Sequence, residues 1–567
     1  MNDQVEDFLA PIKDGRDWKA MELAVLRLLE HCGWESLQYV GQSGDRGADI
    51  LAVRFNSALG QYESYVFQVK AVSGANYVGA AAVNQVIEAQ GVYGSKIAIV
   101  VTNGDFRPSA VTRRDELNRL NFNVRLWNGV FLNRLLSQYP EESMHKKQLR
   151  PYQSDIAKKV ILRFDAGEKN AFYVIATGLG KTVIATEIVN QLYARGLKRI
   201  LVVCHSVPLA IQLQKSFWGQ IGKSIKTRLF MNGVTPIPID GINFGLYQTL
   251  NANLGGLEPG AFDVIIVDEA HHARANAFES CINHLKPRFL VGMTATPWRQ
   301  DGLALERMFG EPLAKMSLID GMRLHYLAHV DYRLMCDNIN WDEVKVLSNH
   351  RLTIRDLNKK LFLPQRDEAI IADIGKVARS INNPKIAIFS PSIQHAKLFT
   401  RLLNCAGIKT GCVTSEDHVA ANKTLLDFSS DKLAAITAVD MLNEGIDVPD
   451  INIIVFLRAT NSRRIFVQQL GRGLRLGHGK EKAIVLDFVS DIRRLALVKE
   501  FNDEAKSKAD SKDASTLFLR NGVVTFNDSK AQRFVDAWLE DVASVEDRSD
   551  AEYLNFPTLT ENKLMDS

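Results

Sequence analysis

A glycine-rich turn in the middle of the chain has the composition of a phosphate-binding loop. The segment Ala176–Thr182, ATGLGKT, follows a short apolar run and precedes a helical pattern. Gly178 and Gly180 allow backbone N–H groups to close around phosphate oxygens at the start of a helix. Lys181 can then reach the terminal phosphates, and the hydroxyl of Thr182 can coordinate Mg²⁺. The sequence therefore predicts a nucleotide site, although isoleucine replaces the residue that usually opens such a loop.

Carboxylates and arginines elsewhere in the chain suit the same chemistry. In Val264–His272, VIIVDEAHH, an apolar run ends directly in two carboxylates. Asp268, at a strand end, suits a contact with Mg²⁺, usually through water, and Glu269 is placed to orient or deprotonate an attacking water. The later segment QQLGRGLR places Arg472 and Arg475 three residues apart, hence on one face if helical. Two such arginines suit the stabilisation of charge on a transferring phosphoryl group.

A second set of residues, near the N-terminus, suits metal-assisted phosphodiester chemistry. Asp49 starts a strand after a glycine-rich turn, and Gln68 and Lys70 lie two apart on the next strand, so both point to one face. Glu22 lies in the middle of a predicted helix. The carboxylate can bind Mg²⁺, the amide oxygen can complete the shell, and the lysine can orient water or neutralise charge. Taken alone, these residues could also be ordinary exposed groups at strand ends.

The composition indicates a multidomain globular protein. At the usual domain size, 567 residues correspond to about three to five domains, and 46% hydrophobic with 24% charged residues excludes a disordered, collagen-like or coiled-coil chain. A net charge of +4 neither indicates nor excludes nucleic-acid binding, because a groove needs only local basic charge. The six cysteines form no CxxC pair, so neither a zinc site nor a disulfide framework is expected. We expect no signal peptide, no membrane span and a cytoplasmic location.

The pattern of apolar runs predicts an α/β multidomain chain. Residues 1–142 predict a mixed α/β domain, and wholly apolar runs alternating with helical patterns from residue 148 predict buried parallel sheets. We expect two parallel-sheet domains at 148–317 and 376–493, joined by a charged, helical connector at 318–375. A polar, short α+β tail follows at 494–567. The elements expected in the first domain and the tail are helices at 18–32, 80–93 and 530–545, strands at 50–55, 65–72 and 96–102, and a strand–turn–strand at 516–526.

The order of the central motifs is similar to that of superfamily 2 nucleic-acid helicases and translocases with two RecA-like lobes. The resemblance covers about 148–493 and rests on LRPYQ, ATGLGKT, DEAH, TATP, VDMLNEGIDVP and QQLGRGLR. TATPWRQDG followed by FGEPL is most similar to the branch of XPB-like helicases and restriction-enzyme motor subunits. The resemblance implies that ATP binds between the lobes, with Gln153 reading adenine. It also implies that Asp447 senses the γ-phosphate side, which Arg472 and Arg475 reach from the second lobe.

The same resemblance implies contacts with nucleic acid. His271, in the DEAH motif, would couple ATP hydrolysis to nucleic-acid binding. Contacts with the phosphate backbone would map to Ser206, Gln248, Thr249 and Ser390, on looser motifs.

The N-terminal residues resemble an Mrr-type restriction endonuclease, a variant of the PD-(D/E)XK nucleases. The resemblance rests on GDRGADI followed by FQVK and extends through VVTNGDFRPSA and VRLWNGVFLNRLL, covering nearly all of 15–140. The variant has glutamine at the usual second acidic position, where this chain has Gln68. The resemblance implies that Asp49 is the catalytic aspartate, with Lys70 and Glu22 in the same site.

Together, the resemblances predict an ATP-dependent DNA helicase or translocase fused to a Mg²⁺-dependent endonuclease. A prokaryotic restriction or anti-phage role follows by analogy. The expected partner is double-stranded DNA. A separate specificity or modification protein is also expected, because no methyltransferase motif or target-recognition domain is apparent. Two alternatives stay open: an N-terminal domain that only docks on DNA, and a motor that acts on RNA, since such lobes contact mainly phosphates.

Overall fold

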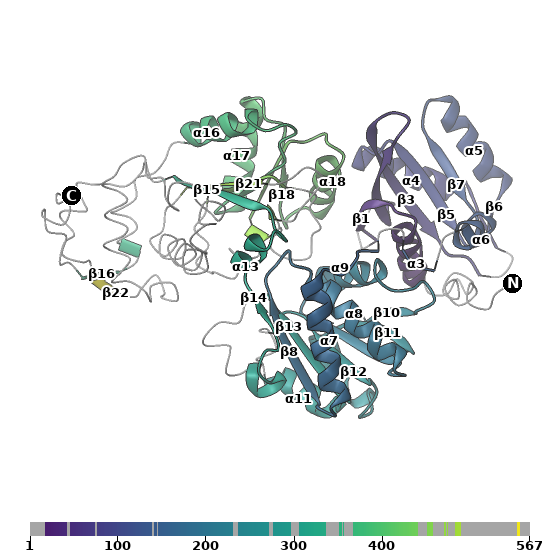
Figure 1. The fold of residues 1–567 in the computed structure, drawn as a ribbon. Helices are drawn as coiled ribbons and strands as arrows, with labels where there is room; N and C mark the ends of the chain where they lie inside the picture. The colour runs from purple at the N-terminus through teal and green to yellow at the C-terminus, as the bar shows by residue number, and fades with distance from the viewer. Residues whose placement is uncertain are drawn as a thin grey trace, which may run out of the picture.

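The apolar runs of the sequence become the strands of three larger sheets in the computed structural model (Figure 1). We call the five-stranded sheet with its helices the N-terminal domain, the seven-stranded sheet the first lobe and the six-stranded sheet the second lobe. The structure describes residues 18–41, 46–73, 76–138, 141–143, 146–230, 236–270, 276–295, 305–335, 351–353, 355–356, 367–439, 451–457, 470–471, 473–474, 482–488 and 553–555.

The N-terminal domain is a mixed sheet with helices on both faces. Its elements are α3 (Trp18–His31), β1 (Glu35–Tyr39), β2 (Ile50–Asn56), β3 (Gln61–Lys70), β4 (Tyr77–Val78), α4 (Ala80–Tyr93), β5 (Ile97–Thr102), β6 (Asp105–Phe106), α5 (Pro108–Arg119), β7 (Val124–Trp127) and α6 (Gly129–Gln138). The strand order is β1-β2-β3-β5-β7, antiparallel up to β3 and parallel beyond it. Alternate residues face opposite sides: Ile50 and Ala52 pack in the cluster that contains α3, and Leu51 and Val53 pack with α4.

The first lobe is a wholly parallel sheet, as the sequence predicts. Its elements are α7 (Pro151–Asp165), β8 (Asn170–Ile175), α8 (Lys181–Ala194), β9 (Arg199–Cys204), α9 (Val207–Trp218), β10 (Thr227–Phe230), β11 (Gly241–Leu246), α10 (Tyr247–Ala252), a 3-10 turn (Leu254–Gly256), β12 (Val264–Val267), α11 (Asn276–Leu285), β13 (Phe289–Thr294), β14 (Lys315–Met316) and α13 (Leu318–Arg323). The strand order is β10-β11-β9-β12-β13-β8-β14. Every residue of β12 and β13 is buried, as expected for strands of a parallel sheet that is covered on both faces.

The second lobe is also a parallel sheet. Its elements are β15 (His329–Met335), α16 (Asp367–Arg379), β17 (Ile386–Phe389), α17 (Ile393–Cys405), β18 (Thr410–Val413), α18 (His418–Ser429), β19 (Ala435–Ala438), β20 (Ile453–Phe456) and β21 (Lys482–Phe488). The strand order is β15-β21-β20-β17-β19-β18. A separate antiparallel pair joins β16 (Arg351–Thr353) to β22 (Tyr553–Asn555).

The connector at 318–375 is helical only in part: it contains α13 and the start of α16, but it also contains strands, which were not expected. Residues 329–335 form β15, which pairs with β21 and extends the second sheet. The segment alternates polar and apolar residues, and Val330 and Tyr332 are buried. Such a period of two is typical of a strand with one covered face. The tail elements expected at 516–526 and 530–545 lie outside the described residues.

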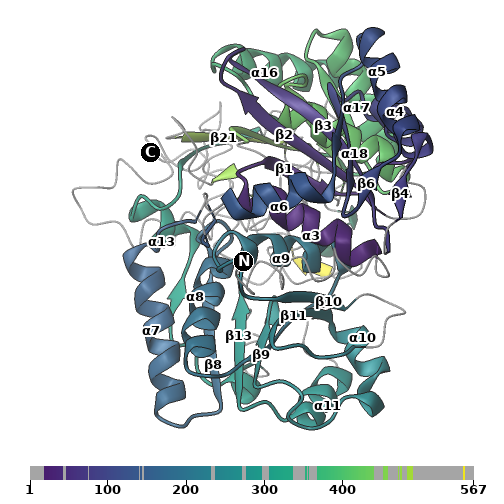
Figure 2. The same cartoon turned by 90° about the vertical axis from the view of Figure 1, so that its right-hand side faces the viewer.

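The N-terminal domain lies beside both lobes. In Figures 1 and 2, α3 lies against α9 of the first lobe, and α18 of the second lobe lies against α4. Within the described part of the chain, no helix combines the length and apolar character that crossing a bilayer requires.

Candidate active sites

The glycine-rich loop of the first lobe turns sharply into helix α8. Gly178 and Gly180 have φ values of 89° and 83°, in the left-handed region that favours glycine. Gly180 caps the helix, and Lys181 is its first residue. A Cβ added at Gly180 would lie 2.5 Å from Nε2 of Gln153, so a side chain there would collide with its neighbour. The loop therefore presents a helix N-terminus, where backbone N–H groups favour an anion such as phosphate.

Gln153, the predicted reader of adenine, is tied to this loop. Its side chain is 4% exposed, and its Oε1 accepts the backbone N–H of Arg150 at 2.9 Å. Its Nε2 donates to the carbonyl oxygen of Leu179 at 2.9 Å, and the hydroxyl of Tyr152 donates to the same oxygen. Hydrogen bonds therefore join the start of α7 to the loop without the help of a ligand.

The lysine of the loop meets both carboxylates that follow β12. Lys181 Nζ forms an ion pair with Glu269 Oε1 and lies 3.9 Å from Asp268 Oδ1. The three side chains are 12%, 9% and 7% exposed, so these charges are shielded from water. Glu269 has a φ of 47°, and its N–H donates to Asp268 Oδ1 at 3.0 Å. Thr294 Oγ1, from the TATP motif, donates to Glu269 Oε2 at 3.4 Å. Residues of three predicted motifs therefore converge.

The groups beside this cluster are held in their protonated forms. Burial, and then the charge of Asp268, raise the pKa of Tyr173 well above its ordinary value, and the Tyr173 hydroxyl donates to the carbonyl of Lys181 at 3.2 Å. Burial and the same carboxylate raise the pKa of Cys204 to about 12. Both neighbours therefore stay neutral beside the carboxylate.

The second lobe reaches the loop through the segment QQLGRGLR. A Cβ added at Gly471 would lie 2.8 Å from Cβ and 2.9 Å from the carbonyl oxygen of Thr177, which belongs to ATGLGKT. The two lobes are therefore in close contact at the predicted nucleotide site. Four residues predicted to act there lie outside the described residues: His271, Asp447, Arg472 and Arg475.

The predicted nucleic-acid contacts follow the carboxyl ends of parallel strands. Ser206 follows β9 and is half-buried, and Gln248 follows β11 and is exposed. Thr249 is buried, and Ser390, directly after β17, is fully buried. Gln248 and Ser206 are therefore the members of this set with side chains accessible to a ligand.

In the N-terminal domain, Asp49 and Gln68 lie side by side. The pairing of Ile50 with Phe67 places Asp49 opposite Gln68. Asp49 is 3% exposed, and its Oδ2 accepts N–H groups from Gln68 Nε2 at 2.9 Å and from the backbone of Val69 at 2.5 Å. These bonds hold the carboxylate in place with neutral donors.

The amide of Gln68 leaves an oxygen available. Its Nε2 donates to Asp49, and among the described residues its buried Oε1 has no hydrogen-bond partner. A Cβ at Gly47, which has a φ of 82°, would lie 3.3 Å from that oxygen. Carboxylate and amide oxygens are the ligands that Mg²⁺ takes, with water completing the shell. The described residues hold no group of three or more His, Cys, Asp or Glu able to bind a metal, and the predicted ligands here are one carboxylate and one amide, those of Asp49 and Gln68.

The remaining predicted residues lie around this pair. Lys70 ends β3, two residues beyond Gln68, and is half-buried. Glu22, on α3, is 2% exposed and accepts the hydroxyl of Tyr39 at 2.8 Å. A Cβ at Gly41 would lie 2.4 Å from Glu22 Oε2, and the N–H of Gly41 donates to the carbonyl of Asp49. Glu22 therefore lies next to Gly41, whose backbone N–H is bonded to the carbonyl of Asp49. Tyr39 was not predicted as a site residue from the sequence. Its position at the end of β1, directly before the glycine-rich turn, is the feature that could have identified it.

Three family models match separate parts of the chain. The model of a restriction endonuclease, of the Mrr catalytic type, matches residues 14–136. The model of the type III restriction enzyme res subunit matches 146–299, and that of the helicase conserved C-terminal domain matches 368–477. The chain therefore joins a region similar to Mrr-type restriction endonucleases to regions similar to restriction-enzyme and helicase motors. We therefore call the N-terminal domain the nuclease domain, and the two lobes the motor.

Known proteins are similar to this chain over about three fifths of its length. The chain is 25% identical over 403 residues to the type I restriction enzyme EcoAI endonuclease subunit of Escherichia coli, covering 64% of this chain and 49% of that protein. It is 23% identical over 382 residues to the DNA 3'-5' translocase XPB2 of Sulfurisphaera tokodaii, covering 61% and 82%. The chain spans about half the length of several curated relatives, from 49% to 59% for three of them.

One solved structure supports the fold. The ATP-dependent type ISP restriction-modification enzyme LlaBIII, bound to DNA, matches with a TM-score of 0.50 at 17% identity, covering 86% of this chain and 37% of that chain. At this level of identity the match concerns the fold alone.

Proposed function

We propose that the chain is an ATP-dependent DNA helicase or translocase with a fused, Mg²⁺-dependent DNA endonuclease. Its role would be restriction or anti-phage defence in a prokaryotic cytoplasm, with double-stranded DNA as substrate and a separate protein supplying sequence specificity. The observation that carries the proposal is that one chain forms two separate clusters of the predicted residues. One joins Lys181 to Glu269. In the other, Asp49 is bonded to the amide of Gln68, whose oxygen has no hydrogen-bond partner among the described residues.

In the motor, we propose that the loop and Lys181 hold the phosphates of ATP, with Thr182 and Asp268 on its Mg²⁺. The incoming phosphates compete for Lys181, which is now paired with Glu269. Release of that pair would leave Glu269 free to orient the attacking water. Asp447, Arg472 and Arg475 would act from the second lobe, and His271 would couple hydrolysis to nucleic acid at Ser206, Gln248, Thr249 and Ser390.

In the nuclease domain, we propose that the carboxylate of Asp49 and the amide oxygen of Gln68 hold Mg²⁺. The ion, when bound, supplies charge stabilisation at the scissile phosphate and lowers the pKa of a bound water. Lys70 would orient the attacking water or neutralise developing charge. Glu22 would assist from α3, where Tyr39 fixes its carboxylate.

A paired assay tests the proposal. Supercoiled plasmid is incubated with the full chain and Mg²⁺, with and without ATP, while phosphate release and nicking are measured in parallel. Asp49→Ala should abolish nicking and keep DNA-stimulated ATP hydrolysis, and Glu269→Gln should abolish hydrolysis. Nicking by Asp49→Ala at the wild-type rate would make the domain a docking module. Stimulation of ATP hydrolysis by RNA but not by DNA would favour an RNA-directed motor.

A further inference from the structure

The nuclease domain is fastened to the first lobe by a buried arginine. Arg27, on α3, donates through Nη1 to the carbonyl of Ile225 at 2.8 Å and through Nη2 to that of Gly222 at 3.0 Å. Arg27 is 5% exposed, and burial lowers its pKa to about 9. Lys223 donates to the carbonyl of Leu136 at 3.2 Å, from the first lobe to α6. We call these contacts the anchor.

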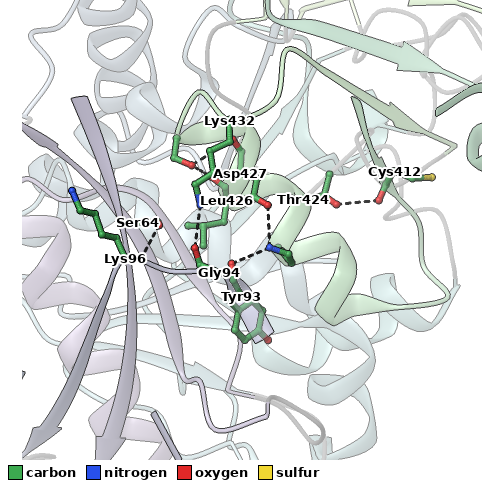
Figure 3. A network of polar contacts seen from close by, with 11 residues as sticks. Ser64, Tyr93, Gly94, Lys96, Cys412, Thr424, Leu426, Asp427 and Lys432 are labelled. Carbon is green, nitrogen blue, oxygen red and sulfur yellow. Dashed lines mark hydrogen bonds and ion pairs between the residues drawn. The ribbon is translucent and has the colours of Figure 1, made fainter. Parts of the chain in front are cut away.

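The nuclease domain is fastened to the second lobe by helix α18. Leu426 is fully buried in the apolar core of the nuclease domain, with residues of α4. Lys432 Nζ donates to the carbonyl of Gly94 at 3.1 Å, and Lys423 Nζ lies 3.4 Å from the carbonyl of Tyr93 (Figure 3). These carbonyls are at the C-terminal end of α4, where the helix dipole favours a cation. Asp427 holds both lysines, at 3.0 and 3.2 Å.

The two junctions differ in how readily they can open. The side chains of Lys423 and Lys432 are 41% and 46% exposed, so water can replace their carbonyl acceptors at little cost. Opening the anchor would instead leave the buried guanidinium of Arg27 without its two carbonyl acceptors. Leaving a buried charged group without hydrogen-bond partners costs considerable free energy. Opening the junction with the second lobe also exposes Leu426, but leaving a buried charge without acceptors costs more than exposing one apolar side chain, so we infer that this junction opens first.

The lobes also touch each other, so three bodies form a closed ring. Gly471 of the second lobe lies against Thr177 in the phosphate-binding loop of the first. In a closed ring, no contact can shift unless another shifts with it. A nucleotide that enters between the lobes must therefore strain or open one of the junctions with the nuclease domain.

We propose that α18 is a latch, formed by Lys423, Leu426, Asp427 and Lys432, which nucleotide-driven movement of the second lobe opens. The nuclease domain travels with the first lobe throughout. The latch rests on the proposed function, because it requires ATP to bind between the lobes.

The closed latch restrains the nuclease site. Helix α18 also contacts β1 and β2, and Asp49 directly precedes β2. A Cβ at Gly47 would lie 2.8 Å from the carbonyl of Gln85 on α4, so α4 borders the same site. The docked second lobe thus packs on β1, β2 and α4, on the last at the end away from Gln85. Opening the latch moves the second lobe off the nuclease domain and leaves more of that domain's surface open to a duplex.

The test uses the full chain with Lys423→Glu and Lys432→Glu together. Its matched control is Lys397→Glu, which reverses an exposed lysine that pairs with Glu416 within the second lobe. Plasmid nicking is measured with Mg²⁺, with and without a non-hydrolysable ATP analogue. In the wild type and the control, the analogue should raise nicking by about tenfold or more. The double variant should nick at that raised rate without nucleotide. Nucleotide-free nicking by the double variant at the wild-type rate would overturn the latch.

A second measurement separates the latch from the proposed nuclease activity. Hydrogen exchange of α18 and of the end of α4 should speed up in the wild type when the analogue is added, and should already be fast in the double variant. This result with no nicking by any variant would support the latch and refute the endonuclease. Nicking with no change of exchange in α18 would support the endonuclease and refute the latch.

Discussion

The two candidate active sites of this chain hold their carboxylates in opposite ways. In the motor, Glu269 is paired with Lys181, a cation of the protein itself. In the nuclease domain, Asp49 accepts bonds from the amide of Gln68 and the N–H of Val69, which are neutral. A phosphate that enters the motor must displace Glu269 from its lysine, whereas a cation that enters the nuclease site meets a carboxylate already in position.

This difference separates two ways of keeping a hydrolytic site idle. The motor site is occupied by its own counter-charge, so its substrate must do the activating. In the proposed nuclease site, hydrogen bonds from Gln68 and Val69 already position the carboxylate, so we expect its control to come from the supply of metal or from access to DNA. Access is what the latch at α18 would govern.

The largest effect should come from exchanging the lysine of each site for alanine. Lys181→Ala should lower DNA-stimulated ATP turnover by about 10³-fold, because the phosphate contact is lost, and should leave nucleotide-free nicking unchanged. Lys70→Ala should lower nicking by about 10²-fold and leave ATP turnover within about twofold. Phosphate release and plasmid nicking measure both. A loss of ATP turnover in Lys70→Ala would show that the sites are not separate.

The amide of Gln68 gives the next effect. Gln68→Leu removes both the free oxygen and the bond to Asp49, so nicking should fall by about 10²-fold and need about tenfold more Mg²⁺. Gln68→Glu restores an oxygen ligand with a charge, so nicking should persist at lower Mg²⁺ concentrations. A Mg²⁺ titration of nicking measures both variants, with ATP turnover as the control. Equal Mg²⁺ requirements in the two variants would exclude Gln68 as a ligand.

Lowering the pH should reduce the stability of the nuclease domain through protonation of His31 on α3. Burial, then the charges of Arg27 and Lys223, lower the pKa of His31 to about 3 from 6.5. Below pH 6.5 the unfolded chain binds a proton that the folded chain refuses, so stability is lost as the pH falls from 6.5 towards 3. Between pH 7 and 5 the opening free energy of α3 should fall by about 2 kcal/mol, measured by hydrogen exchange corrected for intrinsic rates. His31→Gln should remove that slope, and a slope unchanged in the variant would exclude His31 as its source.

Matched glycines give the smallest effect. Gly180 and Gly47 have φ values of 83° and 82°, where an alanine costs about 1–2 kcal/mol. Gly180→Ala also crowds Gln153, and Gly47→Ala crowds the carbonyl of Gln85 and, less closely, the amide of Gln68. Each should cost its own site about tenfold, in the KM for ATP or in the rate of nicking. If either variant impaired both activities equally, general unfolding would be the explanation.

Local sequence patterns predicted the helices and strands well where the apolar residues and their period indicate the same element. Helix α4 has the predicted limits, Ala80–Tyr93, and strand β12 coincides with the apolar run Val264–Val267. Spacing also placed Gln68 and Lys70 on one face. The strand β15 was missed because its alternating pattern lies in a charged stretch that favours a helix at first sight.

Contacts between distant residues could not be predicted from local patterns. The strand register that sets Asp49 beside Gln68 depends on the pairing of β2 with β3. The ion pair of Lys181 with Glu269 joins residues 88 positions apart. The bond of Lys432 to Gly94 joins residues 338 positions apart, and no pattern near either residue announces it.

The junctions of the nuclease domain have a consequence for how this protein tolerates mutation. Arg27, Lys215, Lys223, Lys423 and Lys432 all donate across a junction to backbone carbonyls, never to a partner's side chain in these bonds. Every residue type has a backbone carbonyl, so the residue at an acceptor position can be substituted without loss of the bond. For these bonds, mutational scans should therefore detect the donor residue and tolerate changes of the acceptor residue. Compensating pairs of substitutions should be rare among them, so paired sequence changes should report the apolar contacts of the junctions, such as those of Leu426, rather than these bonds.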